Sequence, residues 1–311
     1  MLKIGSLDLK SNLILAPLSG ISDLPFRMLN REFGCELAFV EMINCRSISN
    51  KSRRTKDMLS SGPLDRPLGI QLLGRELKFI LKAMDVLRSY KFDLLDFNAA
   101  CPVRKVINRG EGAALLKEPK VLAKILRGIV KNSELPVSVK IRSGWDKNSI
   151  NAKEVSLIAE DAGVSAVLLH GRTKAQGYSG QVDYQVIRQV KEALKIPVIA
   201  SGDIFSSELI EKMFKDTDCD GVMVARGALG NPWIFKGCTK TSKTEIIKIM
   251  TKHFKSCLAF YTERIAIIRF RKFFSWYTSG FYNIRPLREK VSRAKTKEEI
   301  INIINLSKDL G

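Results

Sequence analysis

The sequence predicts a closed (β/α)8 barrel, the TIM-barrel architecture, followed by a small all-helical C-terminal domain. Short apolar runs of strand-forming residues recur eight times over about the first 240 residues, and segments with helical periodicity separate most of them. This alternation stops near Ser242. Strands that are apolar on both faces and alternate with helices indicate a parallel sheet, and eight such units fit a closed barrel.

The expected strands, in chain order, are Leu13–Ala16, Leu37–Val40, Leu68–Leu72, Leu94–Phe97, Val137–Ile141, Ala166–Leu169, Val198–Ala200 and Gly221–Val224. The clearest helical patterns between them are Glu76–Ser89, Val121–Lys131, Ala152–Ala162, Tyr184–Ala193 and Ser207–Lys215. An open, Rossmann-like sheet is the alternative, but no GxGxxG motif opens a helix after the first strand. We therefore expect the barrel domain to occupy residues 1–241.

Long helical patterns dominate residues 242–311, which we expect to form a second, basic domain. Residues 241–311 hold 15 Lys and Arg against 6 Asp and Glu. The whole chain of 311 residues has a net charge of +20, which favours a polyanionic partner such as nucleic acid. Basic and aromatic residues interleave in this tail. The aromatic side chains are expected to form its core, and the cations either contact RNA or form a solvated face.

Cysteine usage and the apolar runs exclude several classes of protein. The six cysteines are scattered without a CxxC pair, and there are only two histidines, so neither a metal site nor a disulfide framework is expected. No apolar run approaches the roughly 18–20 residues of a membrane span. The N-terminal residues lack the pattern of a signal peptide, and we expect a cytoplasmic protein.

Polar and small residues follow the predicted strands at nearly every carboxyl end. In barrels of this kind the chemistry is placed there, so a full ring of such residues predicts a site at the barrel mouth. The ring consists of Ala16, Pro17, Leu18, Gln71, Asn98, Cys101, Lys140, Arg142, His170, Arg172, Thr173, Ser201, Gly202, Asp203, Ala225 and Arg226.

The ring has the features of a flavin site. The segments "SGDI" and "ARGALGNP" follow the last two strands, where exposed backbone N–H groups and an arginine suit a phosphate; tight turns that need glycine are the alternative. Lys140 and Arg142 alternate along one strand and point into the mouth together, where they need an anion or an electron-rich acceptor. A flavin offers both. His170 is either a core histidine or part of this site, and Cys101 is either a buried apolar residue or a reagent.

Seven motifs, in this order, resemble those of the dihydrouridine synthases, most closely the bacterial B-type branch. They are "LAPLSGISDLPFR", "QLLG", "FNAACPVRKVINRGEGAALL", "VKIRSGW", "HGRT", "SGDI" and "ARGALGNPWIF", and "RKFFSWYTSGF" in the tail is similar to that family's helical domain. The resemblance implies an FMN-dependent enzyme that reduces uridines of tRNA to 5,6-dihydrouridine, with NADPH (or NADH) as reductant. A monomer is expected.

The resemblance also implies roles for the residues of the ring. Ala16, Pro17, Leu18, Gln71, Lys140 and His170 would surround the flavin ring, and Ser201, Gly202, Asp203, Ala225 and Arg226 would hold its phosphate end. Cys101 would be the general acid that protonates the base, and a thiol with a reference pKa of about 8.5 suits that task. Asn98, Arg142, Arg172 and Thr173 are expected to seat the base. The charge of the tail adds Arg264, Arg269, Arg271, Lys272 and Arg288 as expected phosphate contacts.

Three positions depart from the pattern of the family: Ala100 and Ala225 replace glycines, and Ser201 replaces an asparagine. These substitutions could alter the geometry of the loops that contain them, but all three are small and leave the side-chain charge unchanged. Two other functions compete with tRNA reduction. One is a small-molecule FMN pyrimidine oxidoreductase of the dihydroorotate or dihydropyrimidine dehydrogenase kind, which the basic tail disfavours. The other is a non-catalytic RNA-binding protein, which would carry no flavin.

Overall fold

Eight parallel strands close into a barrel in the computed structural model of the chain, which describes residues 1–48, 53–238 and 241–308. Each strand pairs in parallel with its neighbours, β11 pairs with β3, and β4 pairs with β6, so the ring is closed. All eight predicted strands are confirmed, and with them the TIM-barrel fold. The strands are β3 (Leu13–Leu15), β4 (Leu37–Phe39), β6 (Leu68–Leu73), β7 (Leu94–Asn98), β8 (Val137–Arg142), β9 (Ala166–His170), β10 (Val198–Ser201) and β11 (Gly221–Val224).

The alternation of buried residues along each strand builds two apolar layers. Ile14 and Leu168 point into the barrel, where they meet Phe39 and Met223, whereas Leu15 and Leu169 belong to the layer between sheet and helices. Successive side chains of a strand face opposite sides, and here both sides are buried. This explains why the strands are nearly continuous apolar runs in the sequence.

Three short strands were not predicted. β1 (Leu2–Ile4) and β2 (Leu7–Leu9) form an antiparallel hairpin, and β5 (Ile43–Asn44) pairs with β6 beyond the end of β4. Leu2, Ile4 and Leu9 of the hairpin are buried with the residues that fill the barrel interior. The hairpin therefore covers the amino end of the barrel and leaves the carboxyl end as the open mouth.

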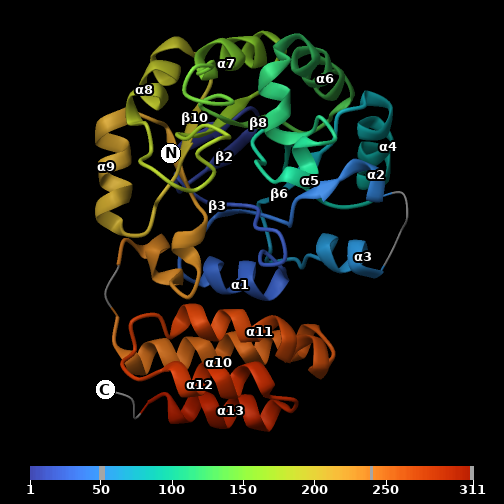
Figure 1. Ribbon diagram of the computed structural model, residues 1–311. Coiled ribbons are helices and arrows are strands. Elements are labelled where there is room, and N and C mark those ends of the chain that lie inside the picture. Colours follow the sequence, from blue (N-terminus) through green and yellow to red (C-terminus); the bar gives the residue numbers. More distant parts are fainter. Residues whose placement is uncertain (49–52, 239–240, 309–311) are drawn as a thin grey trace.

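Helices cover the outside of the barrel (Figure 1). The five helical patterns singled out in the sequence are confirmed as α4, α6, α7, α8 and α9. Two of these helices begin at a side-chain cap, α8 at Asp183 and α9 at Ser206. The barrel-domain helices are α1 (Leu24–Glu32), α2 (Cys45–Ile48), α3 (Arg53–Leu59), α4 (Leu77–Leu87), α5 (Arg104–Ile107), α6 (Pro119–Asn132), α7 (Ala152–Asp161), α8 (Tyr184–Ala193) and α9 (Ser207–Thr217). Three 3-10 helices, η1 (Gly112–Lys117), η2 (Arg226–Ala228) and η3 (Pro232–Lys236), complete this region.

Four helices form the C-terminal region, α10 (Lys243–Phe260), α11 (Glu263–Tyr277), α12 (Arg285–Arg293) and α13 (Lys297–Leu306). They lie together as a layer against α1 of the barrel (Figure 1). The aromatic side chains Phe254, Phe270, Phe273 and Phe274 are fully buried in this region, so they form its core. The boundary after residue 241 stays a prediction, and residues 309–311 lie outside the described residues.

Within the described residues, no helix has the length and apolar character needed to cross a membrane. The same part of the chain contains no group of three His, Cys, Asp or Glu side chains placed to hold a metal ion.

Candidate active site

A cavity of about 430 Å³ opens at the carboxyl ends of the barrel strands, where the sequence predicted a site. All the residues expected around a flavin line it, and so do Asn98, Cys101 and Arg142. Arg172 and Thr173 are absent from its lining. The structure therefore brings together most of the predicted ring, while the binding roles of these residues stay predictions. The flavin set in the lining is Ala16, Pro17, Leu18, Gln71, Lys140, His170, Ser201, Gly202, Asp203, Ala225 and Arg226.

Two glycines beside the last strands are required by close packing. A Cβ at Gly202, whose φ is +129°, would lie 2.8 Å from Val182 Cγ2, and a Cβ at Gly227 would lie 1.8 Å from the carbonyl oxygen of Ile204. Glycine is therefore needed in both segments for the tight turns themselves. Both glycines also line the cavity, so the same turns expose backbone to a ligand.

Asp203 lies between two arginines at this end of the cavity. Its carboxylate accepts a hydrogen bond from Arg172 Nη1 at 2.9 Å and one from Arg226 Nη2 at 2.8 Å. These guanidinium groups, Arg172 first, lower the pKa of Asp203 and keep it ionised. The remaining donors of Arg172, which is fully buried, go to the carbonyls of Ser179 and Gly180. Arg172 therefore anchors the loop after β9, and the expectation that it seats the base finds no support.

Lys140 reaches the cavity from β8 with few partners for its charge. Its ammonium lies 3.2 Å from Ser201 Oγ and 3.4 Å from Met223 Sδ, and neither group is a strong acceptor. Burial lowers the pKa of Lys140 to about 8; Asp96 opposes this shift and Arg142 adds to it. A buried, poorly satisfied ammonium of this kind suits an electron-rich ligand in the cavity.

His170 ends β9 and also faces the cavity. Its Nδ1 is buried and has no hydrogen-bond partner in the described part of the chain. Burial, together with Arg142, Lys140 and other nearby cations, lowers the pKa of His170 to about 2, so its imidazole is neutral throughout the physiological range. His170 lines the cavity among several cations and stays neutral there, which favours the site over the core interpretation.

Cys101 lies in a loop that several contacts hold in place. Asn98 Oδ1 accepts hydrogen bonds from the N–H of Ala100 at 3.0 Å and from that of Cys101 at 2.9 Å. The N–H of Ala113 donates to the carbonyl of Cys101, and a Cβ at Gly112 would lie 2.8 Å from that same oxygen. Burial raises the pKa of the Cys101 thiol above its ordinary value, so the thiol stays protonated at neutral pH.

Arg142 joins the Cys101 loop to the loop after β9. It donates to the carbonyl of Ala100 at 2.8 Å, to that of Thr173 at 3.0 Å and to that of Gly177 at 2.8 Å. Thr173 thus contributes a backbone carbonyl to this clamp. Neither Ala100 nor Ala225 is among the described non-glycine residues with a positive φ, so neither position requires the left-handed conformation that favours glycine.

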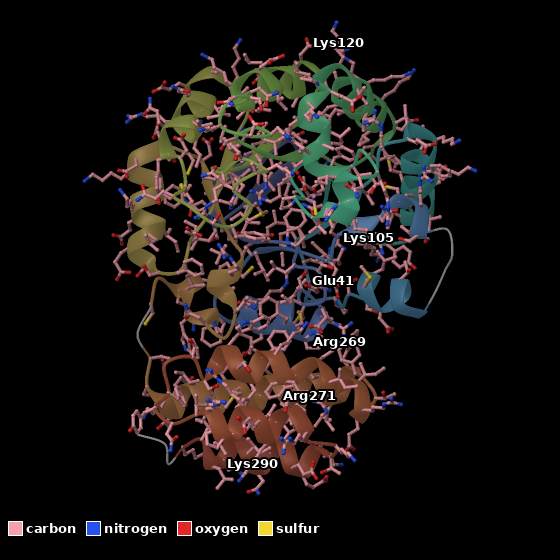
Figure 2. The ribbon with its side chains drawn as sticks, in the orientation of Figure 1. Glu41, Lys105, Lys120, Arg269, Arg271 and Lys290 are labelled. Carbon is pink, nitrogen blue, oxygen red and sulfur yellow. The ribbon has the colours of Figure 1, made fainter. Side chains whose placement is uncertain are left out.

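Four of the five tail cations expected to bind RNA have partners within the protein. Arg269 contacts Asp23 at 3.3 Å and Glu41 at 3.7 Å, and Lys272 donates to the carbonyl of Gly20. Figure 2 shows Glu41 and Arg269 at the boundary between barrel and tail. Arg271 donates to the carbonyl of Ala294 and Arg288 to those of Ser275 and Thr278, whereas Arg264 is exposed. These contacts give Arg269 and Lys272 an interdomain role; RNA contact stays a prediction.

Sequence reasoning missed three residues of the cavity rim. Val103, Tyr178 and Phe205 line the cavity and are exposed large apolar side chains. The guanidinium of Arg226 lies 4.9 Å from the ring centre of Tyr178 and 5.3 Å from that of Phe205. Only loops supply these residues, and no periodicity marks them.

The residues present fit a flavin. Ala16, Pro17 and Leu18 provide an apolar wall for a ring system, while the poorly satisfied Lys140 ammonium offers a polar contact at its edge. Arg226 and the glycine turns offer cationic and backbone groups for a phosphate.

Comparisons with known proteins agree over nearly the whole chain. A family model described as dihydrouridine synthase matches residues 14–310. A Rickettsia conorii protein named "Probable tRNA-dihydrouridine synthase" is 38% identical over 303 residues, which cover 94% of this chain and 92% of that protein. The tRNA-dihydrouridine synthase B of Pseudomonas aeruginosa is 33% identical over 303 residues, which cover 94% of this chain and 91% of that one.

Among solved structures, the Amycolatopsis orientalis BexX/CysO complex contains a chain that matches with a TM-score of 0.51 and 17% identity. The match covers 90% of this chain and 96% of that one. At this identity the likeness concerns the fold alone. The sequence matches, in contrast, span barrel and tail alike.

Proposed function

The chain belongs to the dihydrouridine synthase family, whose members reduce uridines of tRNA in a flavin-dependent reaction, and on that premise we propose which residues of this chain do the work. The cavity at the barrel mouth binds FMN, Cys101 protonates the uracil ring, and NADPH supplies the reducing equivalents. The observation that carries this proposal is that one cavity is lined by Cys101, by Lys140 and by the glycine turns after β10 and β11.

Saturation of the C5–C6 bond of uracil requires a hydride equivalent at C6 and a proton at C5. Bound reduced flavin supplies the first of these. Cys101 supplies the second: its S–H bond breaks, a C–H bond forms at C5, and the resulting thiolate regains a proton from water. The raised pKa of Cys101 keeps the proton on sulfur until the base is in place.

The other residues set the charge of the cavity. Lys140, Arg142 and Arg226 place positive charge around it, which stabilises negative charge on a phosphate and on a reacting ring. His170 contributes a neutral imidazole, so it can bind through hydrogen bonds without adding a further charge. A base that is stacked within folded RNA cannot enter the cavity at the barrel mouth, so the target nucleotide must first be turned out of the stack.

Cofactor analysis of the purified protein tests the proposal directly. We expect a non-covalent flavin, released on denaturation and identified as FMN, and its reduction by NADPH under anaerobic conditions. Recovery of FAD, or of no flavin with none rebinding, would contradict the assignment of the cavity.

Substrate analysis separates tRNA reduction from its rivals. We expect the protein to form dihydrouridine in tRNA from a strain that lacks the gene, and to have no activity on free uracil or dihydroorotate. Turnover of the free pyrimidines would instead support a small-molecule oxidoreductase.

A further inference from the structure

A chain of side-chain hydrogen bonds runs from the barrel interior to the Cys101 loop. Asp96, on β7, is fully buried, and its Oδ2 accepts a hydrogen bond from Gln71 Nε2 at 2.6 Å. Gln71 Oε1 accepts one from Asn98 Nδ2 at 2.8 Å. Asn98 Oδ1, in turn, accepts from the backbone N–H of Ala100 and of Cys101.

The acceptor at position 96 gives this chain its direction. Burial raises the pKa of Asp96 to about 7, and the hydrogen bonds from Gln71 and Ser138 together with the nearby Lys140 oppose that shift. Oδ2 accepts from Gln71 both when Asp96 is ionised and when a proton on Oδ1 is shared with the Ser138 hydroxyl, so Gln71 turns its NH2 group toward Asp96 and its carbonyl oxygen toward Asn98. Asn98 must then direct its NH2 group at Gln71 and its carbonyl oxygen at the Cys101 loop. With both amides reversed, the NH2 group of Asn98 would face the backbone N–H of Cys101, a donor against a donor.

We propose that Asp96 is a positioning residue: through Gln71 and Asn98 it holds the Cys101 loop and, with it, the thiol that protonates the base. The inference rests on the proposed function for its catalytic consequence, but the hydrogen-bond chain itself does not depend on that function.

The location of Asp96 in the barrel interior indicates that this residue does more than fill space in the core. Several other interior positions of the barrel are apolar, such as Ile14, Leu168 and Ile199, whereas Asp96 lies among the polar side chains of Gln71 and Ser138. An apolar residue at position 96 would avoid the cost of burying a carboxylate, and such replacements are often neutral or stabilising. Ser138 Oγ, at 2.7 Å from Oδ1, is a second donor to the same carboxylate, but it leads to no loop of the cavity.

Asp96 also lies close enough to Lys140 to raise the pKa of that ammonium, so its charge is an alternative reason for its presence. Two substitutions separate the alternatives. Asp96→Leu removes both the acceptor and the charge. Asp96→Asn removes the charge but keeps a carbonyl oxygen for Gln71, since its NH2 group can donate to the hydroxyl of Ser138.

The first measurement is the rate at which iodoacetamide alkylates Cys101 in the purified protein, followed by mass spectrometry of the Cys101 peptide. This resolves Cys101 from the exposed Cys238. We expect Asp96→Leu to speed alkylation about fivefold, the population change that one hydrogen bond of typical net strength produces. Asp96→Asn is expected to stay within about twofold of the wild type on the same argument. Ser138→Ala, which removes the other donor to Asp96, serves as the matched control and should leave the rate unchanged.

The second measurement is the single-turnover rate of the flavin-reduced protein on tRNA, together with tRNA affinity. Asp96→Leu should lower the rate by about 10- to 100-fold, since misplacement by about 1 Å can cost that much, with the dissociation constant for tRNA unchanged. A loss in rate without a loss in affinity is not expected from general destabilisation.

Equal alkylation rates in the wild type and Asp96→Leu would overturn the proposal. Equal defects in Asp96→Asn and Asp96→Leu would also overturn it, in favour of a charge partner for Lys140. If Asp96→Leu does not fold, Gln71→Met cuts the same chain and must show the faster alkylation. If the wild type contains no flavin or leaves tRNA unchanged, the proposed function fails, while the alkylation rates still decide the role of Asp96.

Discussion

Replacement of Arg269 by glutamine should reveal whether this cation holds the tail to the barrel or binds RNA. Arg269 projects from α11 with a side chain that is 22% exposed, and it lies between Asp23 and Glu41, whose side chains are 2% and 3% exposed. Asp23 also accepts hydrogen bonds from the hydroxyl of Tyr261 and from the N–H of Phe26. Arg269→Gln would therefore leave two buried carboxylates without their nearest cation.

The expected decrease in the free energy of unfolding follows from this geometry. Breaking a buried ion pair by removal of one partner destabilises by about 3–5 kcal/mol, and we expect about 3 kcal/mol because Tyr261 and Phe26 still satisfy Asp23. Burial raises the pKa of Asp23 and Arg269 holds it down, so Arg269→Gln raises that pKa further. A carboxyl with a raised pKa in the folded state destabilises that state more as pH rises. The difference in the free energy of unfolding between the wild type and Arg269→Gln should thus be larger at pH 7.5 than at pH 5.5.

Urea unfolding at the two pH values measures this cost, and Arg264→Gln is the matched control. Arg264 is exposed on the same helix and takes part in none of the hydrogen bonds and ion pairs found among the described residues, so its loss should change stability by no more than about 0.5 kcal/mol. In salt titrations of tRNA binding, a lost phosphate contact lowers the log–log slope by about 0.7–0.9. We expect that change for Arg264→Gln and none for Arg269→Gln. Equal stabilities of the two variants, or a shallower slope for Arg269→Gln, would refute the interdomain role.

Three further predictions concern groups with shifted proton affinity. Cys101→Ala should keep FMN and its reduction by NADPH but lose about 10²–10⁴-fold in single-turnover rate on tRNA; an unchanged rate would remove Cys101 from the mechanism. The same rate in the wild type should fall above about pH 8, because Lys140, with a pKa of about 8, then loses the charge that it places at the cavity, whereas His170, with a pKa of about 2, is neutral throughout; an unchanged rate between pH 7 and pH 9 would contradict this. His253 is buried among aromatic rings with a pKa lowered to about 3, so the unfolded state gains a proton first as pH falls below 6.5. His253→Phe should remove about 2 kcal/mol of the stability lost between pH 6.5 and 5, measured by urea unfolding, and an unaltered pH dependence would show that His253 is not responsible.

The barrel was predictable because its strands are buried on both faces, so each strand is a nearly continuous apolar run in the sequence. The β1–β2 hairpin was missed because each of its three-residue strands has a charged residue at its centre (LKI and LDL), whereas the equally short β3 and β4 are continuous apolar runs (LIL and LAF). The ring of cavity residues was predictable for a related reason: parallel strands of a barrel all end at one face, so residues that follow them must meet.

The partners of the charged residues were not predictable in this way. Arg269 and Asp23 are 246 positions apart, and nothing local marks them as a pair. The tail does carry a positive net charge, but four of its cations contact other parts of the protein: Arg269, Arg271, Lys272 and Arg288. Asp96 did leave a signal, since a carboxylate inside the apolar run "LLDF" needs a partner wherever that run is a buried strand.

The buried cations of the chain therefore fall into two groups, one at the cavity and one between the tail and the barrel. At the cavity, the Lys140 ammonium is largely enclosed and has no strong hydrogen-bond acceptor, so a ligand that supplies one would add to the stabilisation that nearby Asp96 gives its charge. At the tail, Arg269 and Lys272 are satisfied by the barrel itself, through Asp23 and the carbonyl of Gly20. Gly20 follows the segment that lines the cavity through Ala16, Pro17 and Leu18. The tail thus contacts the chain two to four residues from the proposed flavin wall, so its contact with the barrel lies next to the proposed site.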